Sequence, residues 1–326
     1  MVNFTDMTAP TVYSLRPRIV PNTYDQVHEA LVVNADGLPV TGLRCRQIDE
    51  ADIGAVATLL ARGFPVHDRQ FWLDALAQLT RREPPAGLPK YGYLLTSDGI
   101  AVGAILMICS ELADGDTATG IRCNLSSWYV DPTFRAYATM LVSHALRHKN
   151  VTYTNVSPAP HTRPIIEAQG FARYSDGVFV AMPALHGLFR AQPVKVFDAR
   201  RAPDVDYDPA DRDLLVQHMA HGCIGLWCVT AQRAYPFVFR PRRIKRVIPC
   251  AQLIFCRDVG DFVRFAGPIG RALVRRGCPF VICDANAPIP GLFGFFRGGR
   301  MPKYFKGPQR PRLGDLAYTE YALLGV

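Results

Sequence analysis

The residues with the clearest chemical potential lie in one stretch, residues 122–150. Its β-branched and aromatic end at residues 128–130 predicts a strand. Asp131-Pro132 ends that strand, because proline has no amide hydrogen to donate to a ladder. After a short turn, apolar side chains recur at helical spacing over residues 136–148. The stretch therefore predicts a strand, a turn and a helix that begins with small residues.

This arrangement suits a ligand that contains phosphate. The first amides of a helix lack internal partners and carry the positive end of the helix dipole, so they attract anions. Arg135 lies where it adds a full positive charge, and the small side chains of Ala136 and Ala138 let a pyrophosphate approach the backbone closely. The alternative interpretation is a plain crossover between parallel strands that binds no ligand.

The stretch resembles the acyl-coenzyme A loop of the GNAT-type N-acyltransferase superfamily. That loop has the pattern Val-x-Pro, two residues, Arg-Gly-x-Gly-x-Gly/Ala and then a leucine-rich helix. The residues that match are Val130, Pro132, Arg135 and Leu141, whereas Ala136, Ala138 and Met140 replace the small residues of the pattern. The resemblance implies acetyl-CoA or another acyl-CoA as co-substrate. It also implies cofactor contacts from Tyr129, Val130, Arg135, Ala136, Tyr137, Ala138 and Thr139.

The order of the predicted elements is similar to the same superfamily from Leu43 to about Met182. The pattern predicts strands over residues 43–48, 91–96, 100–110, 124–130, 151–156 and 177–182, and helices over 53–62, 68–81, 136–148 and 163–169. Asp98-Gly99 between the second and third of these strands is typical of a tight hairpin.

From Val194 onward the sequence predicts a second unit with the same order of elements. The expected helices are 208–219 and 262–276, the expected strands are 223–229, 234–239, 247–256, 279–283 and 316–324, and a turn rich in proline and glycine runs through Gly298. Glycines near Arg264 are expected to mark a packing or kink site within the later helix.

The predicted fold class is α/β (α+β), with two tandem GNAT-like domains that each have a mixed, mostly antiparallel sheet flanked by helices. We expect an irregular leader over residues 1–42, an acyl-CoA-binding domain over 43–186, and a second domain over 194–326 without a recognisable cofactor loop. The boundary between the domains is expected between Pro183 and Pro193.

N-acyl transfer from a thioester needs a polarised carbonyl, a deprotonated amine and an acid for the departing thiolate. The resemblance implies that main-chain amides of residues 124–130 polarise the carbonyl, because the sheet of such folds opens there. The carboxylate that the family often carries on this strand is absent, and Ile166 stands where the family often has a tyrosine acid. The acid is therefore left open. The remaining candidates for the base are Glu111, Tyr129, Asp131 and His161, each of which has a purely structural alternative.

Composition narrows the class of protein. The chain has 326 residues, 49% of them hydrophobic, which is ample for a folded core. No apolar run approaches the roughly 20 residues of a membrane span, and no secretory signal is visible, so a cytoplasmic protein is expected. The net charge of +9 comes largely from arginines in the second half. A solvated basic face is the first interpretation of this charge, an anionic cofactor or substrate the second, and nucleic acid an unlikely third.

Nine cysteines show neither Cys-x-x-Cys nor zinc spacing. They predict buried, reduced thiols and no metal site. His218 and His221 are expected to be surface groups rather than ligands.

The leading functional hypothesis is an acyl-CoA-dependent N-acyltransferase that moves an acyl group, expected to be acetyl, to an amine on a small molecule or peptide. The second domain would wall the acceptor site or form the interface of a homodimer. The alternative is a non-catalytic tandem module with a binding or regulatory role, and a polyanion-binding protein ranks third.

Overall fold

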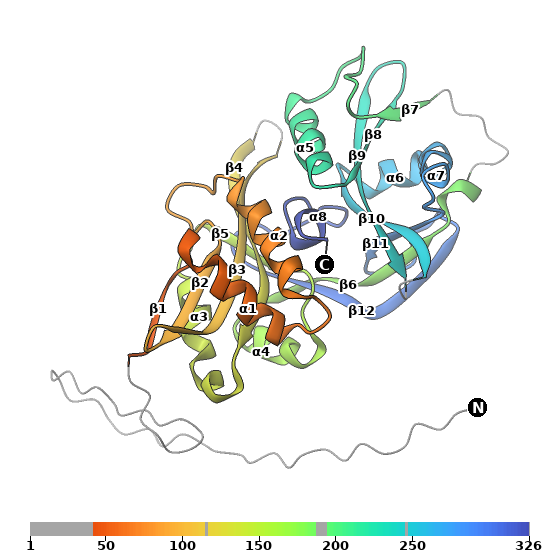
Figure 1. Cartoon of the computed structure of the whole chain (residues 1–326). Helices are drawn as coiled ribbons and strands as arrows, with labels where there is room; N and C mark the ends of the chain where they lie inside the picture. The colour runs from red at the N-terminus through yellow and green to blue at the C-terminus, as the bar shows by residue number, and fades with distance from the viewer. Residues whose placement is uncertain (1–41, 115–116, 187–193, 245–246, 326) are drawn as a thin grey trace, which may run out of the picture.

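The computed structural model describes residues 42–114, 117–186, 194–244 and 247–325. Within them, twelve strands form one sheet in the order β1-β2-β3-β4-β5-β12-β6-β11-β10-β9-β8-β7 (Figure 1). The strands are β1 Arg44–Gln47, β2 Gly92–Ser97, β3 Ile100–Asp114, β4 Thr117–Val130, β5 Val151–Asn155, β6 Ala172–Ala181, β7 Lys195–Asp198, β8 Ile224–Val229, β9 Ala234–Ile244, β10 Ile248–Cys256, β11 Phe280–Ala285 and β12 Gly294–Lys306.

Helices flank this sheet. The α-helices are α1 Ile53–Gly63, α2 Arg69–Thr80, α3 Ala138–Ala145, α4 Arg163–Ala168, α5 Pro209–Ala220, α6 Val259–Arg264, α7 Ala266–Val274 and α8 Glu320–Leu323. The short 3-10 helices are η1 Glu50–Asp52, η2 Pro132–Tyr137, η3 Pro160–Thr162 and η4 Pro183–Leu185. No helix in the described parts of the chain is long and apolar enough to cross a bilayer. The predicted fold class is confirmed, because the sheet is mixed, mostly antiparallel and flanked by helices.

The two halves of the chain build the sheet in the same way. In the first half β1 to β4 pair antiparallel and β5 joins β4 in parallel. In the second half β7 to β10 pair antiparallel and β11 joins β10 in parallel. The sixth strand of each half crosses over, because β12 lies between β5 and β6, and β6 lies between β12 and β11.

This exchange changes one expectation. Separate sheets were predicted for the two units, but the units share one sheet, since the exchanged strands cover edges that would otherwise be unpaired. The glycine-rich segment predicted to be a turn forms the start of β12, because β6 pairs with it from Gly294 to Gly298. The domain limits stay predictions. The leader up to residue 41 and the linker residues 187–193 lie outside the described residues.

The predicted final strand over residues 316–324 is wrong. An isolated bridge joins Asp315 to Phe255, Tyr318 has a left-handed backbone with φ of 56°, and the short helix α8 follows. Most residues of the segment are apolar because it is buried between the halves, so its periodicity could not distinguish a strand from a helix.

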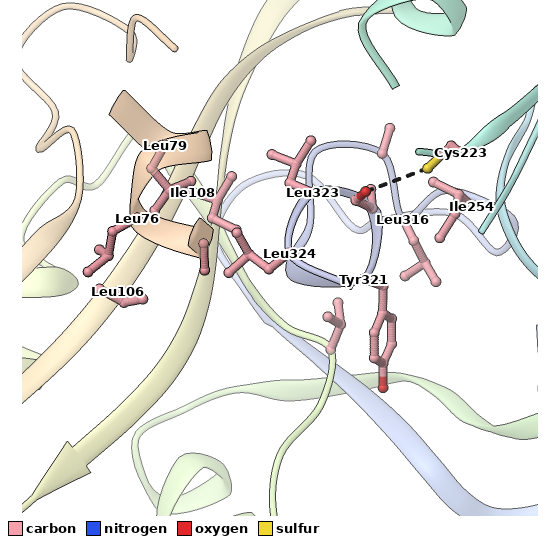
Figure 2. Close-up of a cluster of buried hydrophobic side chains, with 14 of the residues drawn as sticks. Leu76, Leu79, Leu106, Ile108, Cys223, Ile254, Leu316, Tyr321, Leu323 and Leu324 are labelled. Atoms are coloured by element: carbon pink, nitrogen blue, oxygen red, sulfur yellow. Dashed lines mark hydrogen bonds between the residues drawn. The ribbon is translucent and has the colours of Figure 1, made fainter. Parts of the chain in front are cut away.

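Alternation along β3 separates two layers of core. Leu106 and Ile108 pack with α1, α2 and α8, whereas Ile105 and Met107 pack with α3. Figure 2 shows the first of these layers, in which Leu76 and Leu79 of α2 lie near Leu106 and Ile108, with Leu323 and Leu324 of the C-terminal segment beside them. The C-terminal segment is therefore part of the core that joins the halves.

The predicted helix over residues 262–276 is split at Phe265 into α6 and α7. Gly267 and Gly270 of α7 pack against η4, where an added Cβ would come within 2.3 Å of the His186 oxygen and 2.1 Å of the Ala184 nitrogen. The interpretation of this segment as a packing and kink site is confirmed.

One pair of cysteines corrects the expectation of free thiols. Cys109 and Cys123 form a disulfide, because they lie directly opposite each other on β3 and β4 with their Cα atoms 4.0 Å apart. The other seven cysteines are free, and six of these are buried. Burial raises the pKa of the Cys223 thiol to about 11, as expected for an inert core residue.

Candidate active site

A β-bulge interrupts β4 near its end. Ser126 pairs with Leu106 and Tyr129 pairs with Ala104, so β4 has one more residue than β3 between these two pairs. Ser127 has a φ of 51°, an uncommon backbone conformation for a residue with a side chain. Bulges of this kind bend a strand and are over-represented next to active sites.

The sheet opens just before the bulge. β4 and β5 pair only from Ile121 with Val151 to Asn124 with Thr154. Beyond Asn124, no strand of the described chain covers the edge of β4 that faces β5. Backbone groups of the bulge can therefore serve a ligand in this opening, as expected for residues 124–130.

A cavity of about 250 Å³ occupies the opening. Its apolar walls come from both core layers, and they include Phe64, Trp72, Ile105, Leu125, Trp128, Val142, Ile166 and Phe171. The indole N–H groups of Trp72 and Trp128 are buried and have no acceptor among the described residues. Unsatisfied buried donors are rare, so both N–H groups are candidates to bind carbonyl oxygens of a ligand.

A buried carboxylate lies in the same cavity. Glu320, the first residue of α8, is 2% exposed and accepts hydrogen bonds from the hydroxyls of Ser126 and Ser157. Burial raises the pKa of Glu320, although the two hydroxyls and the charges of Lys303 and Arg242 oppose that shift. A carboxylate with a raised pKa beside a bulged strand is well suited to accept a proton.

Polar contacts fix the segment that carries Glu320. Buried Arg122 of β4 lies 3.0 Å from Asp315, and it donates a hydrogen bond of 2.8 Å to the carbonyl of Ala317. The Tyr318 amide donates a hydrogen bond of 3.0 Å to Nε2 of His218. The second half of the sequence thus places a carboxylate in the opening of the first half.

The environment of His218 corrects the expectation of a surface group. Its side chain is fully buried, and its Nδ1 lies 2.8 Å from the Leu214 carbonyl. Burial lowers the pKa of His218 to about 4, so the ring is neutral and donates from Nδ1 while Nε2 accepts. No group of three potential metal ligands occurs among the described residues.

Tyr129 and Asp131 lie at the end of the bulged strand. The Tyr129 ring packs over Gly63, where an added Cβ would come within 2.3 Å of the ring. Burial and the neighbouring Asp131 carboxylate raise the pKa of Tyr129. Asp131 accepts an ion-paired hydrogen bond of 2.8 Å from Arg62. These two candidates lie close together but are not among the residues that line the cavity.

The structure separates His161 and Glu111 from the cavity wall. His161 is exposed on η3, although its neighbour Thr162 lines the cavity. Glu111 is exposed five residues beyond Leu106 on β3, about 17 Å away at the usual strand rise. It lines a different cavity, of about 600 Å³, together with Arg122 and Asp315.

The predicted phosphate turn is more regular than a glycine loop. It forms η2, in which the Phe134 and Ala138 amides donate to the carbonyls of Asp131 and Arg135. Ala138 has φ of −54°, and Ala136 has no left-handed backbone. Arg135 is exposed and has no ion-pair partner among the described residues. The side chain of Arg135 is therefore available to an anion, whereas part of the backbone is already used.

The remaining predicted cofactor residues surround this turn. Val130 is buried, Thr139 is exposed on α3, and Tyr137 packs against the core layer of α3. The Tyr137 hydroxyl is buried without a partner in the described chain.

The sequence interpretation missed Glu320, Trp72 and Trp128. One signal for Glu320 was present, because an acidic residue flanked by Tyr321, Ala322 and Leu323 has to be either exposed or specifically bound. No local pattern marks the two tryptophans, since their role depends on the opening between β4 and β5.

Comparisons with known proteins agree at the level of fold. No protein-family model and no curated protein matches the chain. Among solved structures, a GCN5-related N-acetyltransferase (GNAT) from Kribbella flavida is 14% identical with a TM-score of 0.50, over 81% of this chain and 70% of that one.

A putative acetyltransferase from Pyrococcus horikoshii is also 14% identical, with a TM-score of 0.50 over 92% of this chain and 100% of that one. A protein of Enterococcus faecalis described as a probable N-acyltransferase has 9% identity and a TM-score of 0.54, over 85% and 74%. The chain therefore has the fold of the GCN5-related N-acetyltransferases, as the sequence resemblance predicts.

Proposed function

We propose that this chain, which has the fold of the GCN5-related N-acetyltransferases, is an acyl-CoA-dependent N-acyltransferase with its active site in the opening between β4 and β5. One observation carries the proposal. The buried carboxylate of Glu320 lies in the same cavity as the bulge of β4 and is hydrogen-bonded to Ser126 beside that bulge.

The cavity suits the thioester arm of acyl-CoA. That arm is narrow and contains two amides, whose carbonyl oxygens are hydrogen-bond acceptors. The apolar walls match its methylene groups, and the unsatisfied indole N–H groups of Trp72 and Trp128 match its acceptors. Arg135 and the start of α3 would hold the phosphates, with Tyr129, Val130, Ala136, Tyr137, Ala138 and Thr139 around them.

The reaction follows from these positions. The amine nitrogen attacks the thioester carbon, and the carbonyl electron pair moves onto oxygen, where amides of the bulged strand stabilise the charge. The tetrahedral intermediate collapses, the carbon–sulfur bond breaks, and the thiolate leaves. Glu320 accepts the proton of the amine. The thiolate takes its proton from solvent, since Tyr129, the sequence candidate on the bulged strand, does not line the cavity.

Kinetics of Glu320→Gln test this assignment. With acetyl-CoA and a panel of primary amines, we expect kcat to fall by about 10²- to 10⁴-fold, the usual contribution of a general base, with CoA affinity unchanged. Glu111→Gln is the matched control, because that carboxylate lies on the same sheet outside the cavity, and it should retain activity. A fully active Glu320→Gln, or an inactive Glu111→Gln, would contradict the assignment.

Donor binding is tested separately at Arg135. Arg135→Ala removes the unpaired guanidinium at the predicted phosphate turn and should weaken CoA binding by about 1–3 kcal/mol, the value of a charge-assisted hydrogen bond. Lys149→Ala removes one exposed positive charge just beyond the end of α3, away from the phosphate turn, and serves as control. Equal dissociation constants for wild type and Arg135→Ala at low salt would remove this residue from the site.

One observation favours the alternative, a non-catalytic tandem module. Amides of η2 are used inside the turn, which leaves fewer donors for pyrophosphate than a glycine loop has. Calorimetric titration with acetyl-CoA and longer acyl-CoA tests donor binding, which both hypotheses allow. Acylation of an amine by the protein then separates the enzyme from the non-catalytic module. Within the leading proposal, the acceptor is a small-molecule or peptide amine, and cytoplasmic location and homodimer formation remain expectations.

A further inference from the structure

A second, larger cavity adjoins the proposed active site. It has a volume of about 800 Å³ and shares Ser157 and Pro158 with the cavity at the bulge. Its floor is the sheet face that carries Val178, Cys250 and Ile282, while neighbouring residues of β10 and β11 pack on α6 and α7 from the other face. Cavities of this volume are typical for small-molecule ligands.

The wall of this cavity is strongly basic. Among the residues that the structure describes, five arginines line it, and no aspartate or glutamate does. They are Arg163, Arg242, Arg243, Arg297 and Arg300. None of the five forms an ion pair with a carboxylate in the described ranges, whereas buried Lys303 nearby is paired with Asp284 at 2.8 Å. The uncompensated charge therefore lies at the cavity wall rather than in the core.

Two of these arginines have buried donors without acceptors. Nη1 of Arg242 and Nε of Arg163 are inaccessible to solvent and have no hydrogen-bond partner in the described chain. The Arg242 guanidinium lies 4.8 Å from the centre of the Tyr321 ring, and Tyr321 follows Glu320 directly. A buried, unsatisfied guanidinium donor is costly, so the arrangement favours a ligand that brings acceptor oxygens.

We infer that the acceptor substrate is a small amine that also carries an anionic group, a carboxylate or a phosphate. This inference rests on the proposed function. Arginine binds both groups through paired, charge-assisted hydrogen bonds. The anionic group would lie among the arginines, and the amine would lie toward Ser157 and Glu320, where the two cavities meet. The arginines then select the acceptor, and the carboxylate of Glu320 receives its proton.

The first experiment measures anion binding without any acyl donor. Inorganic pyrophosphate is titrated calorimetrically into wild type and into Arg163→Gln/Arg242→Gln. We expect binding at least ~10-fold weaker in the double variant, since each lost charge-assisted contact is worth roughly a factor of ten. The control Arg200→Gln/Arg201→Gln makes the same change of charge at exposed residues outside the cavity and should bind as wild type does. Equal binding by all three proteins overturns the anion site.

A single variant guards against misfolding of the double one. Arg300→Gln changes an exposed residue of the same wall and should weaken pyrophosphate binding with an unchanged melting temperature. If Arg300→Gln and the double variant both bind as wild type does, the inference is wrong.

The second experiment identifies the role of the site. Acyl transfer from acetyl-CoA is compared for matched amines, phosphoethanolamine with ethanolamine and glutamate with glutamine. We expect kcat/KM to favour the anionic member by at least ~10-fold, and Arg163→Gln/Arg242→Gln to abolish that preference without changing the Kd of CoA. A weaker Kd for CoA in the double variant would assign the arginines to the donor phosphates and overturn the inference.

The outcomes also separate the inference from the proposed function. Arginine-dependent binding of pyrophosphate without CoA binding would keep an anion site but reject acyl transfer and, with it, the acceptor assignment. CoA binding and transfer to neutral amines only would keep the enzyme and reject the anionic acceptor. Tighter binding of a single-stranded oligonucleotide than of pyrophosphate would indicate a polymer ligand and would also reject it.

Discussion

The sheet opens at an equivalent place in each half of the chain. One opening holds a cavity, and the other is filled by the chain itself. In the first half, β4 and β5 separate after Asn124 and leave a cavity. In the second half, β10 and β11 separate after Gln252, but the C-terminal segment fills the space between the halves (Figure 1). The comparison shows how one architecture provides a binding site in one half and a closed core in the other.

Backbone hydrogen bonds close the second opening. β10 has its own bulge, because Leu253 pairs with Phe239 and Phe255 pairs with Val238. Along the edge that β9 does not occupy, the Cys256 amide donates to Gly314 at 2.9 Å, and the Leu316 amide donates to Ile254 at 2.7 Å. Residues 314–316 thus take the place that a ligand would need.

The helix that follows β10 is closed to phosphate as well. The Asp258 side chain caps α6 and accepts from the Gly260 amide at 2.6 Å. Arg257 is paired with Asp208 and Asp211 at 2.7 Å. A carboxylate at a helix start competes directly with an anionic ligand, so the first amides of α6 are not offered to a phosphate. The C-terminal segment that fills the opening of the second half also places Glu320 in the cavity of the first half. Both halves therefore depend on this one segment.

The largest effect is expected from reopening the closed half. Leu316 is fully buried between Ile254 and the rest of the core. Leu316→Ala should lower the free energy of unfolding by about 3–4 kcal/mol, the transfer and cavity cost of a buried leucine. Urea unfolding measures this, and Leu185→Ala, at a half-exposed residue of η4, should cost well under ~1 kcal/mol. Similar decreases in the free energy of unfolding of both variants would mean that packing of the C-terminal segment is not essential for stability.

The turn into this segment has a sharper control. Gly314 has φ of 77°, and an added Cβ would come within 2.6 Å of the buried Cys256 sulfur. Gly277 has the same φ of 77°, and no heavy atom of the described residues lies within 4 Å of an added Cβ. Gly277→Ala should therefore cost about 1 kcal/mol from backbone strain alone, and Gly314→Ala about 2 kcal/mol more from overpacking. Equal losses would show that the contact with Cys256 relaxes freely.

The pH dependence of stability tests the contact between His218 and the Tyr318 amide, which holds the same segment. Burial lowers the pKa of His218 to about 4 in the folded state, against 6.5 when unfolded. The unfolded state therefore binds the proton more tightly, so the contribution of His218 is full above about pH 6.5 and is lost as the pH falls toward 4. By linkage, wild type should lose about 2 kcal/mol from this group between pH 7 and pH 5.

The measurement is urea unfolding at both pH values. His218→Gln should lack this part of the pH slope, whatever its stability at pH 7, while His161→Gln at an exposed histidine should keep it. A slope in His218→Gln equal to that of wild type would place the titrating group elsewhere.

Sequence patterns predicted those parts of the fold that depend on neighbouring residues. Asp98 and Gly99 have φ of 49° and 81°, as the predicted tight hairpin requires. Asp131-Pro132 ends β4 as expected, and the helix that follows begins within two residues of the predicted start. These signals are local, since each is encoded by the residues that adopt the conformation.

The features that were not predicted depend on distant partners. β12 joins the sheet because Phe296 pairs with Phe179 of β6, more than a hundred residues earlier. Glu320 enters the site because Ser126 and Ser157 bind it from the other half. The sequence predicted that the sheet opens near residues 124–130 but not the bulge of β4. The left-handed backbone there belongs to Ser127, and a serine does not signal that conformation as a glycine would. Such residues acquire their roles from the fold, so a pattern within one segment cannot identify them.

The smallest effect is expected at the phosphate turn, where the contrast between the halves depends on backbone conformation. Ala138 has φ of −54°, and its amide donates a hydrogen bond to the Arg135 carbonyl. The turn therefore does not need the wider range of backbone angles that glycine allows. Ala138→Gly should cost about 0.5–1 kcal/mol of stability and leave the Kd of CoA within about twofold. Thermal shifts of both proteins, with and without CoA, measure both quantities. A clearly tighter Kd in Ala138→Gly would show that the turn reorganises into a glycine-like cradle around pyrophosphate and that alanine had limited it. If CoA shifts neither protein, the first opening binds no donor, and the two halves differ only in what fills them.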